Sequence, residues 1–577
     1  MTMLTKWGAA LDRSCPLPEY PRPQLRRESF YNLNGVWNYA VTPSGDEPEV
    51  WAGEIVVPFS PEAPLSGAAR GPAKDEYLHY RRGFTLPEGF QKSRVLLHFG
   101  AVDQIAEVFV NGVSAAKHSG GYWPFSADIT SLLREGENFL RVTVRDNADD
   151  PTFAYGKQRY KRGGMWYTAQ SGIWQTVWLE SVPEVYVKSL RITPEFDEAR
   201  VRIELETALE SSAAITCDVR AADGSFVAGS WAKGGVCVVP LPGFRAWTPD
   251  DPYLYTLDIT CGEDHVESYF AMRKFSYVEL DGHKVFGLNN APLFHNGLLD
   301  QGYFPDGLLT PPSDEAMVND IETMKRCGFN MLRKHIKIEP LRWYYHCDRL
   351  GMIVWQDMVS GGQPYSFLHV SALPTLGKVD LPDQDAKPYG RSGVLSRARF
   401  RREMADTVRL LYNCPCIALW TVFNEGWGQF DALDMANELK KLDPTRFIDH
   451  ASGWQDQGYE EMKSRHIYFR PVKLKNDGRA LALTEYGGYI LAVDGHRWTD
   501  KVFGYRICRN SAALAHDYEK LMLGQVLPHI RKEGLTAAVY TQITDVEEEL
   551  NGLMTYDREV LKIPEETLRE INKQLKF

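Results

Sequence analysis

The stretch from Ser313 to Trp355, SDEAMVNDIETMKRCGFNMLRKHIKIEPLRWYYHCDRLGMIVW, decides the fold. Ser313 to Arg326 has a helical period, Asn330 to Arg333 is a short strand-like run, a second helical period extends to Leu350, and Met352 to Trp355 is another strand-like run. Strand-like runs that alternate with helical periods predict parallel strands joined by crossover helices. The stretch therefore predicts an α/β domain.

The same alternation continues to the end of the chain. Leu293-Phe294 can open the series, and further strands are predicted at Ile417–Val422, Phe447–Asp449, Ile467–Tyr468, Leu481–Thr484 and Ala537–Thr541. Eight parallel strands in this part of the chain fit a TIM (β/α)8 barrel, whose typical size is about 250 residues. We expect the barrel to occupy residues 279–577.

The residues before the barrel have a β pattern. Between Arg26 and Val182 short alternating runs are separated by turn residues, and Ala106–Val110 is followed by Asn111-Gly112, a pair typical of a tight hairpin. A second β stretch follows, of about the length of an immunoglobulin-like sandwich. We expect two β modules ahead of the barrel, at 1–182 and 183–278.

Composition excludes several classes of protein. The 577 residues include 65 Lys and Arg against 76 Asp and Glu, a net charge of -11, and they contain no basic block that would follow a phosphate backbone. Met1–Pro18 lacks the apolar core of a signal peptide, and no stretch approaches the ~18 apolar residues of a membrane span. We therefore expect a soluble cytoplasmic protein that binds neither nucleic acid nor membrane.

The cysteines predict no metal site. Nine cysteines are odd in number and scattered, which favours free, mostly buried thiols over disulfides. Cys414-Pro-Cys416 is the one close pair, and it has no second Cys or His pair nearby, so packing is the favoured interpretation. We expect no metal and no cofactor.

Glu425 and Glu485 each follow an apolar strand. Ile417–Gln429, IALWTVFNEGWGQ, carries Asn424-Glu425 into a loop rich in Gly and Trp, and Leu481–Gly488, LALTEYGG, does the same with Glu485. Because active sites of TIM barrels lie at the carboxyl ends of the strands, both side chains are expected to point into one pocket. Two converging carboxyl groups suit glycoside hydrolysis, in which one donates a proton and the other attacks the anomeric carbon. Either Glu alone would more often be a loop residue or a helix N-terminal charge.

With these residues the chain resembles glycoside hydrolase family 2, which includes β-galactosidases, β-glucuronidases and β-mannosidases. Asn413–Trp420 followed by Asn424-Glu425 resembles the acid/base signature of the family, and Thr484–Gly487 resembles its nucleophile motif. The other similar stretches are Ser171–Glu180, Leu288–Gly297, Asp348–Trp355 and Asn551–Arg558. The resemblance covers nearly the whole chain.

The resemblance implies a fold and a set of roles. The fold is an N-terminal jelly-roll sugar-binding domain, an immunoglobulin-like β-sandwich and a C-terminal TIM barrel. Glu425 would be the general acid/base, Glu485 the nucleophile of a double displacement, and Asn424 a partner of the sugar 2-hydroxyl. Arg333 would support the ionised nucleophile and lower its pKa by charge proximity.

Further residues are predicted to bind the substrate, each with a structural alternative. Tyr468 would donate its hydroxyl to Glu485 or pack as a barrel-rim aromatic, and Asp357 would bind a sugar hydroxyl or form a salt bridge. Three aromatic side chains would stack on sugar faces or pack in the barrel: Trp427, Trp454 and Tyr486. His335 and His466 complete the predicted set.

Departures from the family pattern concern the sugar. Many members have Arg, two small residues and His-Tyr-Pro at the second strand, whereas residues 333–337 are Arg-Lys-His-Ile-Lys, so Ile336 takes the place of the family histidine and His335 lies one place early. The strand-eight Trp is replaced within Tyr540–Asp545, and the sixth-strand Asp-x-His becomes Ser464-Arg-His466. These departures leave the two glutamates untouched and put the identity of the sugar in doubt.

One departure argues against a uronic acid. β-Glucuronidases carry an Asn-x-Lys motif shortly before a Gly near the eighth strand, and here the residues are Glu549-Leu-Asn551 before Gly552. With an acid, Glu549, in place of the Asn and no lysine in the motif, a sugar carboxylate would meet repulsion and not a partner. Lys334 and Lys337 are alternative sources of positive charge, so a glucuronidase is the second interpretation and a neutral sugar the first.

The sequence predicts a retaining exo-β-glycosidase of β-galactosidase type. Exo action would follow if the loop from Tyr155 to Tyr167, rich in aromatic and basic residues, closes one end of the cleft; the alternative is a solvated loop. Other interpretations are a β-glucuronidase, arabinosidase or mannosidase of the same family, a transglycosylase, or a carbohydrate-binding pseudoenzyme. The expected partner is a glycoside, and a monomer and a homo-oligomer both stay open.

Overall fold

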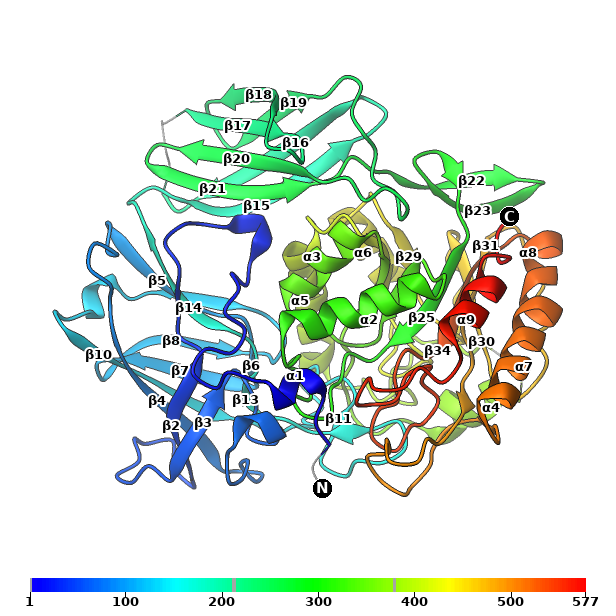
Figure 1. Ribbon diagram of the computed structural model, residues 1–577, viewed down its shortest axis with the longest axis horizontal. Helices are drawn as coiled ribbons and strands as arrows, with labels where there is room; N and C mark the ends of the chain where they lie inside the picture. Colours follow the sequence, from blue (N-terminus) through cyan, green and yellow to red (C-terminus); the bar gives the residue numbers. More distant parts are fainter. Residues whose placement is uncertain (1–2, 210–213, 377–379) are drawn as a thin grey trace.

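The computed structural model describes residues 3–209, 214–376 and 380–577, which form three regions in chain order (Figure 1). The N-terminal β region is blue to cyan at the left, the second β region lies at the top, and the barrel fills the right half of the view. The predicted fold class, two β modules ahead of a TIM barrel, is confirmed. The domain boundaries at 182/183 and 278/279 stay predictions.

Two antiparallel sheets of the N-terminal region share one apolar core, because alternate residues of each strand face inward. One sheet has the order β1 (Tyr31–Asn32), β14 (Val177–Val182), β5 (Arg94–Phe99), β9 (Phe125–Asp128). The other has the order β3 (Gly53–Val57), β2 (Gly35–Thr42), β4 (Tyr77–Thr85), β10 (Glu137–Arg145), β7 (Ile105–Val110), β8 (Val113–Ser119). Short elements complete the region: α1 (Lys6–Ala9), β6 (Val102–Asp103), β11 (Gln158–Arg159), β12 (Tyr167–Thr168) and β13 (Gly172–Ile173).

The predicted hairpin lies between β7 and β8. Asn111 and Gly112 have φ angles of 52° and 84°. Positive φ at both central positions is the requirement of a type I′ turn, which Asn-Gly meets at little cost. The hairpin prediction is confirmed.

The second β region is an antiparallel sandwich around a core of buried apolar residues, with seven strands among the residues that the structure describes. One sheet has the order β15 (Val187–Glu195), β16 (Arg200–Thr207), β19 (Val236–Pro240). The other has the order β18 (Phe226–Ala232), β17 (Ile215–Arg220), β20 (Tyr255–Cys261), β21 (Asp264–Phe270). A three-stranded sheet then leads into the barrel: β22 (Phe275–Leu280), β23 (His283–Leu288) and β24 (Ala291–Pro292).

Eight parallel strands form the barrel, in the order β29-β28-β27-β26-β25-β34-β31-β30. Their bounds are β25 (His295–Asp300), β26 (Met331–Lys334), β27 (Ile353–Asp357), β28 (Ile417–Thr421), β29 (Phe447–Asp449), β30 (Met462–Ile467), β31 (Ala480–Gly487) and β34 (Leu535–Thr541). The larger helices around them are α2 (Asp314–Arg326), α3 (Leu341–Leu350), α5 (Val394–Leu411), α6 (Ala432–Leu442), α7 (Ser511–Leu521), α8 (Leu527–Glu533) and α9 (Glu565–Asn572). Ser313 caps α2, and Gly351 ends α3 in a left-handed conformation.

Two barrel strands differ from the prediction. Leu293 donates its N–H to Phe286 of β23, so the first barrel strand begins only at His295. The sixth strand begins at Met462, not at Ile467, because its residues 463–466 are all polar and offer no apolar run. Strand detection by apolar runs fails where polar residues point into a barrel.

The barrel has a seam between β29 and β30. In the described part of the chain no strand ladder joins these two end strands. Side chains bridge them instead: Ser464 of β30 donates its hydroxyl to Asp449 of β29, and Ile448 N–H donates to Glu461 at 3.2 Å. The bridges hold the nearly closed barrel together at the one place where backbone pairing stops.

Apolar side chains close the amino-terminal end of the barrel. Phe286 of β23 stacks on Phe447, the first residue of β29, at 4.3 Å between ring centroids, and it meets Trp355 at 5.9 Å. These residues and Trp247 belong to one buried cluster that includes the first residues of several barrel strands. We call this cluster the barrel floor.

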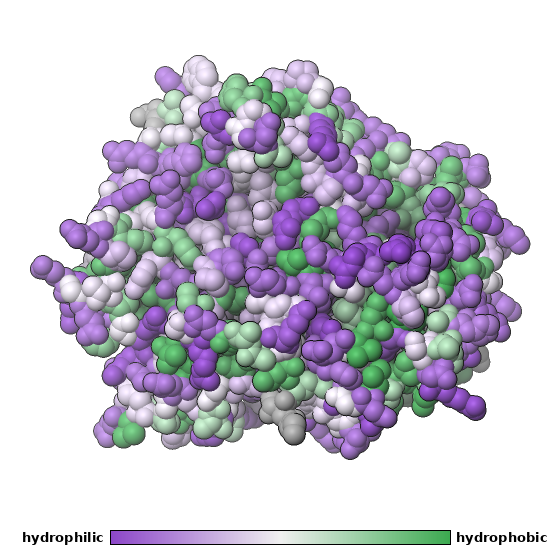
Figure 2. Space-filling model, in the orientation of Figure 1, coloured by the Kyte–Doolittle hydropathy of each residue, from purple (hydrophilic) through white to green (hydrophobic). Residues whose placement is uncertain are grey.

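The polarity of the surface and the burial of the cysteines agree with what the sequence predicts. Figure 2 shows a largely hydrophilic face in which apolar residues form separate small groups. Searching residues 3–209, 214–376 and 380–577 finds no helix with the length and apolarity that crossing a membrane requires. None of the nine cysteines forms a disulfide in the described structure, and eight of them are buried, as predicted.

Candidate active site

Glu425 and Glu485 meet at the carboxyl end of the barrel. Glu425 lies in the loop after β28, where its N–H donates to the carbonyl of Ser452 at 2.9 Å and its φ is 54°. A left-handed φ at a residue other than Gly costs of the order of 1–2 kcal/mol and is often found at functional sites. Glu485 lies near the end of β31. The strands thus deliver both carboxyl groups to one pocket.

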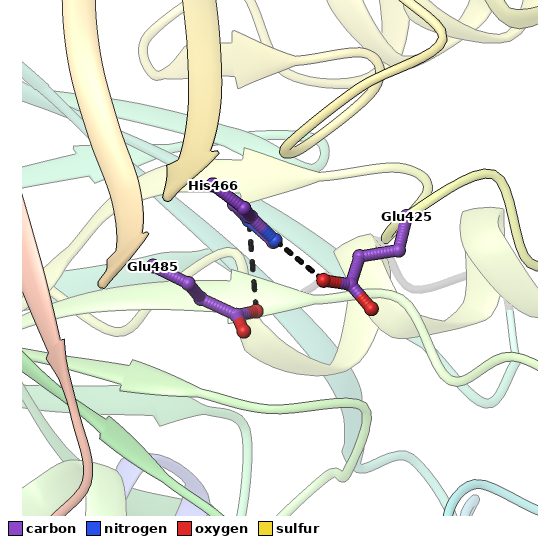
Figure 3. Close-up of side chains that lie close together, drawn as sticks. All are labelled: Glu425, His466 and Glu485. Atoms are coloured by element: carbon purple, nitrogen blue, oxygen red, sulfur yellow. Dashed lines mark hydrogen bonds and ion pairs between the residues drawn. The ribbon is translucent and has the colours of Figure 1, made fainter. Parts of the chain in front are cut away.

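His466 stands between the two glutamates, as Figure 3 shows. Its Nδ1 is 2.8 Å from Glu425 Oε1, and its Nε2 is 3.6 Å from Glu485 Oε1. One ligand atom from each of the three side chains lies within 4.8 Å of the others. Retaining glycosidases place their two carboxyl groups about 5–5.5 Å apart, and inverting ones place them about 6.5–9.5 Å apart. One oxygen of Glu425 and one of Glu485 lie within 4.8 Å of each other, which is compatible with the shorter spacing.

Arg333 holds several polar side chains of the active-site pocket in place. Its fully buried guanidinium makes a bidentate pair with Asp357, with both N–O distances 3.0 Å, and contacts Glu485 Oε1 at 3.2 Å. It also donates to Asn424 Oδ1 at 2.9 Å, which leaves the amide NH2 of Asn424 for a substrate. Asp357 is therefore an ion-pair partner, which is one of the two interpretations offered for it.

Tyr468 reaches the nucleophile candidate. Its hydroxyl donates to Glu485 Oε2 and lies 3.0 Å from Thr541 Oγ1. Its ring stacks on Tyr505 at 3.9 Å between centroids. Tyr505 lies far outside the predicted strands, and no motif in the sequence singled it out.

The two glutamates differ in their surroundings. The Glu425 side chain is 23% exposed and has His466 as its hydrogen-bond partner, whereas Glu485 is 6% exposed and is held by Arg333 and Tyr468. Burial raises the pKa of Glu425 to about 7, which keeps a proton available near neutral pH. Burial also raises the pKa of Glu485, although His466 and Arg333 lower it. Arg333 acts in the predicted direction, but burial outweighs it.

His466 is a neutral partner for the acid. Burial lowers its pKa to about 3, so the ring carries no charge at neutral pH. A neutral imidazole nitrogen donates to an ionised Glu425 or accepts from a protonated one, depending on the tautomer. Glu425, His466 and Glu485 are also close enough to share a metal ion, and an ion bound there would occupy both carboxyl groups and block their chemistry.

The predicted aromatic residues separate into two groups. Trp454 donates to the carbonyl of Glu425 at 2.9 Å and lies beside His466 in the lining of a cavity of about 70 Å³. Trp427 lies at the mouth of the barrel, 5.0 Å from the ring of Trp166. Tyr486 is different, because it follows Glu485 in the strand and points to the other face, where its hydroxyl is 3.0 Å from the sulfur of Met522. The interpretation of Tyr486 as a sugar-stacking residue was wrong; it packs between barrel and helices.

Three basic residues at or just after the end of β26 have separate places. Lys334 pairs with Asp300 and Glu339, both at 2.7 Å, and Lys337 pairs with Glu339 at 2.9 Å. Neither lysine is therefore free to bind a sugar carboxylate. His335 faces the pocket, with Nε2 3.8 Å from Glu485 Oε1.

A loop of the N-terminal region docks on the barrel mouth. Tyr155 and Gly156 both donate their N–H groups to the carbonyl of Ser360, at 3.1 and 3.0 Å, and the Tyr155 hydroxyl donates to Gly362 at 2.6 Å. The loop brings the buried Lys157 beside the pocket. The residue was missed from sequence, where only the basic and aromatic composition of the loop was noted.

Comparison with known proteins finds three family models in chain order. The sugar binding domain of glycosyl hydrolases family 2 matches residues 64–183, the glycosyl hydrolases family 2 model matches residues 185–273, and the TIM barrel domain of the same family matches residues 311–474. Together they cover well over half of the chain.

Individual relatives are distant. A beta-galactosidase of Thermoanaerobacter pseudethanolicus is 25% identical over 387 residues, which are 64% of this chain and 47% of the relative. The chain thus spans about half the length of that relative. A beta-glucuronidase of Paenibacillus borealis is 22% identical over 535 residues, covering 82% of this chain and 85% of the relative.

Solved structures share the fold over nearly the whole chain. A beta-glucuronidase from an uncultured Clostridium sp. has a TM-score of 0.75 at 19% identity and covers 96% of this chain and 99% of its own. A GH2 beta-galacturonidase from Eisenbergiella tayi, bound to glycerol, has a TM-score of 0.69 at 19% identity and covers 96% of this chain and 98% of its own. At this identity the likeness shows the fold alone.

Proposed function

This chain belongs to glycosyl hydrolase family 2, and from that premise we propose that it is a retaining exo-β-glycosidase that removes a terminal neutral sugar, with β-galactosidase-like selectivity. The observation that carries the proposal is the spacing of Glu425 and Glu485, whose nearest oxygens lie within 4.8 Å of each other. That spacing suits attack by one carboxylate while the other protonates the leaving group.

The surroundings support one role for each glutamate. Glu425, with its pKa raised to about 7, donates the proton to the glycosidic oxygen and then takes a proton from water in the second step. Glu485 attacks the anomeric carbon, forming a covalent glycosyl-enzyme that water then hydrolyses. Arg333 and Tyr468 both donate to Glu485, so they orient it and stabilise its charge before the attack. Asn424 offers its amide to the 2-hydroxyl of the sugar.

Two observations support the finer parts of the proposal. The loop containing Tyr155 and Gly156 docks against Ser360 at the barrel mouth, a position in which it would block an extended chain and favour action on terminal sugars. Lys334 and Lys337 are both paired with Glu339, so neither supplies the charge that a uronic acid needs.

The first experiment is an assay against nitrophenyl β-glycosides of galactose, glucose, glucuronic acid, mannose, fucose and arabinose, with Glu485→Ala as the blank. We expect one neutral glycoside to be hydrolysed by the wild type alone. Proton NMR of the first product should show the β-anomer, because double displacement retains configuration. An α-anomer would overturn the assigned mechanism.

A second experiment identifies the nucleophile directly. A 2-deoxy-2-fluoro glycoside of the accepted sugar should leave its glycosyl group on the peptide that contains Glu485, as detected by mass spectrometry. Label on another residue would contradict the assignment. A wild type that hydrolyses none of the glycosides and takes up no label would favour the carbohydrate-binding pseudoenzyme instead.

A further inference from the structure

A chain of buried side-chain amides leads from Glu549 to His335. Asn551 Nδ2 donates to Glu549 Oε1 at 3.0 Å, and Gln542 Nε2 donates to Asn551 Oδ1 at 2.9 Å. Gln301 Nε2 then donates to Gln542 Oε1 at 2.8 Å, and Gln301 Oε1 lies 3.0 Å from His335 Nδ1. We call this chain the amide relay; each of its members is at most 5% exposed.

The relay has a direction, because Glu549 accepts hydrogen bonds at both of its carboxyl oxygens, from the Tyr167 hydroxyl at 2.6 Å and from Asn551. A carboxylate only accepts, so Asn551 must turn its NH2 group toward Glu549 and its oxygen toward Gln542. The same reasoning orients Gln542 and then Gln301, whose oxygen is left facing the histidine. An amide oxygen only accepts, so the proton of the His335 ring must sit on Nδ1.

The tautomer leaves Nε2 of His335 as a bare acceptor. Burial holds the pKa of His335 well below its usual range, so the ring is neutral and Nε2 carries a lone pair. Nε2 is buried, and no hydrogen-bond partner for it exists among the described residues. Its nearest charged neighbours are Glu485 Oε1 at 3.8 Å and Asp357 Oδ2 at 3.9 Å, and neither is a donor when ionised. A buried acceptor of this kind is costly until a donor arrives.

Lys157 brings a positive charge close enough to act on His335. Gly156, with φ +63°, approaches so closely that a Cβ there would lie 3.0 Å from the carbonyl of Ile336, the residue after His335. Lys157 Nζ lies 5.5 Å from the centroid of the Trp166 ring. Among the described residues, this cation–π contact is the one found for Nζ. The positive charge of Lys157 also lowers the pKa values of His335 and Glu425.

We propose that His335 and Lys157 together hold one hydroxyl group of the sugar, which donates its proton to His335 Nε2 and accepts from Lys157 Nζ. The inference rests on the proposed glycosidase function and names the substrate class more closely. A hydroxyl group is both donor and acceptor, so it satisfies both side chains at once. A carboxylate would pair with the ammonium but turn an acceptor toward the lone pair of Nε2. The site therefore selects a sugar with a hydroxyl group, and not a carboxylate, at this position.

The test is a double-mutant cycle between enzyme and substrate. His335→Leu and Lys157→Met are assayed against the accepted glycoside and against a series in which one hydroxyl group at a time is removed. Each variant should lose roughly 10- to 100-fold in kcat/KM on the full substrate, the usual effect of leaving a buried polar group unpaired. On the deoxy glycoside that lacks the bound hydroxyl group, the same variants should lose nothing further.

Lys161→Met is the matched control, because Lys161 lies in the same loop and is exposed. It should retain wild-type kcat/KM on every glycoside. Equal losses on all deoxy glycosides would show that His335 and Lys157 act only on the structure of the pocket, and would overturn the inference. Selective loss of uronide hydrolysis in Lys157→Met would show that the ammonium binds a carboxylate, and would overturn it as well.

A second measurement does not depend on turnover. Nitrogen-15 NMR of the histidine rings, with the His335 signal assigned by its absence in His335→Leu, should show a proton on Nδ1 and none on Nε2. Gln301→Leu should abolish this preference, because the relay then ends before the ring. A proton on Nε2 in the wild type would overturn the relay. A wild type that hydrolyses no glycoside overturns the proposed function alone, whereas active enzyme with unchanged variants overturns this inference alone.

Discussion

The two ends of the barrel are built from the same eight strands and differ in almost everything else. The barrel floor is apolar, with Phe286 stacked on Phe447 and both fully or almost fully buried. The carboxyl end is equally buried, yet it contains Arg333, Glu485 and His466. Burial at the floor stabilises the fold at about 25 cal/mol per Å² of apolar surface, while burial of the charged groups at the other end costs free energy.

The contrast shows how one barrel separates stability from chemistry. The floor needs no particular charge, so its strands begin with Met331, Ile353 and Phe447. At the carboxyl end the raised pKa of Glu425 is the direct result of taking a carboxyl group out of water. Apolar burial at the barrel floor therefore offsets the free-energy cost of burying charged groups at the carboxyl end. Substitutions at one end can be tested without changing the other.

The largest expected effect is at the carboxyl end. Glu485→Gln should lower kcat roughly 10⁴-fold or more, because loss of a nucleophile removes the covalent route while the fold persists. The measurement is hydrolysis of the glycoside that the wild type accepts. The matched control is Glu461→Gln, at the floor end of the β29/β30 seam, where Glu461 accepts from Ile448. A similar loss of activity in the control would contradict the separation of the two ends.

The next effect is at the floor. Phe286→Ala should lower the free energy of unfolding by about 3–5 kcal/mol, because it removes a fully buried ring and leaves a cavity. Chemical denaturation measures the loss, and kcat of the folded variant should stay within about twofold of wild type. A large fall in kcat with unchanged stability would show that the floor shapes the pocket.

A smaller effect is an increase, and not a decrease, in the free energy of unfolding. The folded-state pKa of Glu425, about 7, lies above the ordinary value of 4.5, so the carboxyl group disfavours the folded state progressively as pH rises from below 4.5 to above 7. Glu425→Gln should therefore raise the free energy of unfolding by about 1–3 kcal/mol at pH 8 and by less at pH 5. Denaturation at the two pH values checks this, and a pH-independent difference would speak against a raised pKa.

The smallest expected effect on stability is at the seam between β29 and β30. Ser464→Ala removes the hydroxyl group that donates to Asp449, and it should cost about 1–2 kcal/mol because Asp449 stays buried. The rate of backbone hydrogen exchange should rise first in β29 and β30. In the described part of the chain no ladder joins these two strands to each other. Uniform exchange across the barrel would indicate that side chains do not hold the seam.

The fold was predictable from sequence because its signals are local. Alternating helices and strand runs, Asn111-Gly112 at the hairpin and Ser313 before α2 each report short-range preferences. The sixth strand was placed too late because its inward residues, Ser464 and His466, are polar. A barrel strand that serves an active site loses the apolar pattern that identifies strands.

The site was predictable only where a motif marks it. Glu425, Glu485 and Asn424 follow apolar strands, so the barrel topology places them together. Tyr486 was misplaced, since strand alternation turns it away from Glu485. Lys157 could not be found from sequence, because its place depends on how the N-terminal region docks on the barrel.

The docking of the loop around Gly156 has a consequence for how such a protein can evolve. The carboxyl groups to which we assign bond cleavage, Glu425 and Glu485, lie on the barrel, while Lys157 lies in a loop of the N-terminal region. Under the proposal for Lys157, exchanging or reshaping that loop changes the accepted sugar while Glu425 and Glu485 stay in place. A library randomised over residues 155–167 would test how far changes in this loop alone alter the accepted sugar.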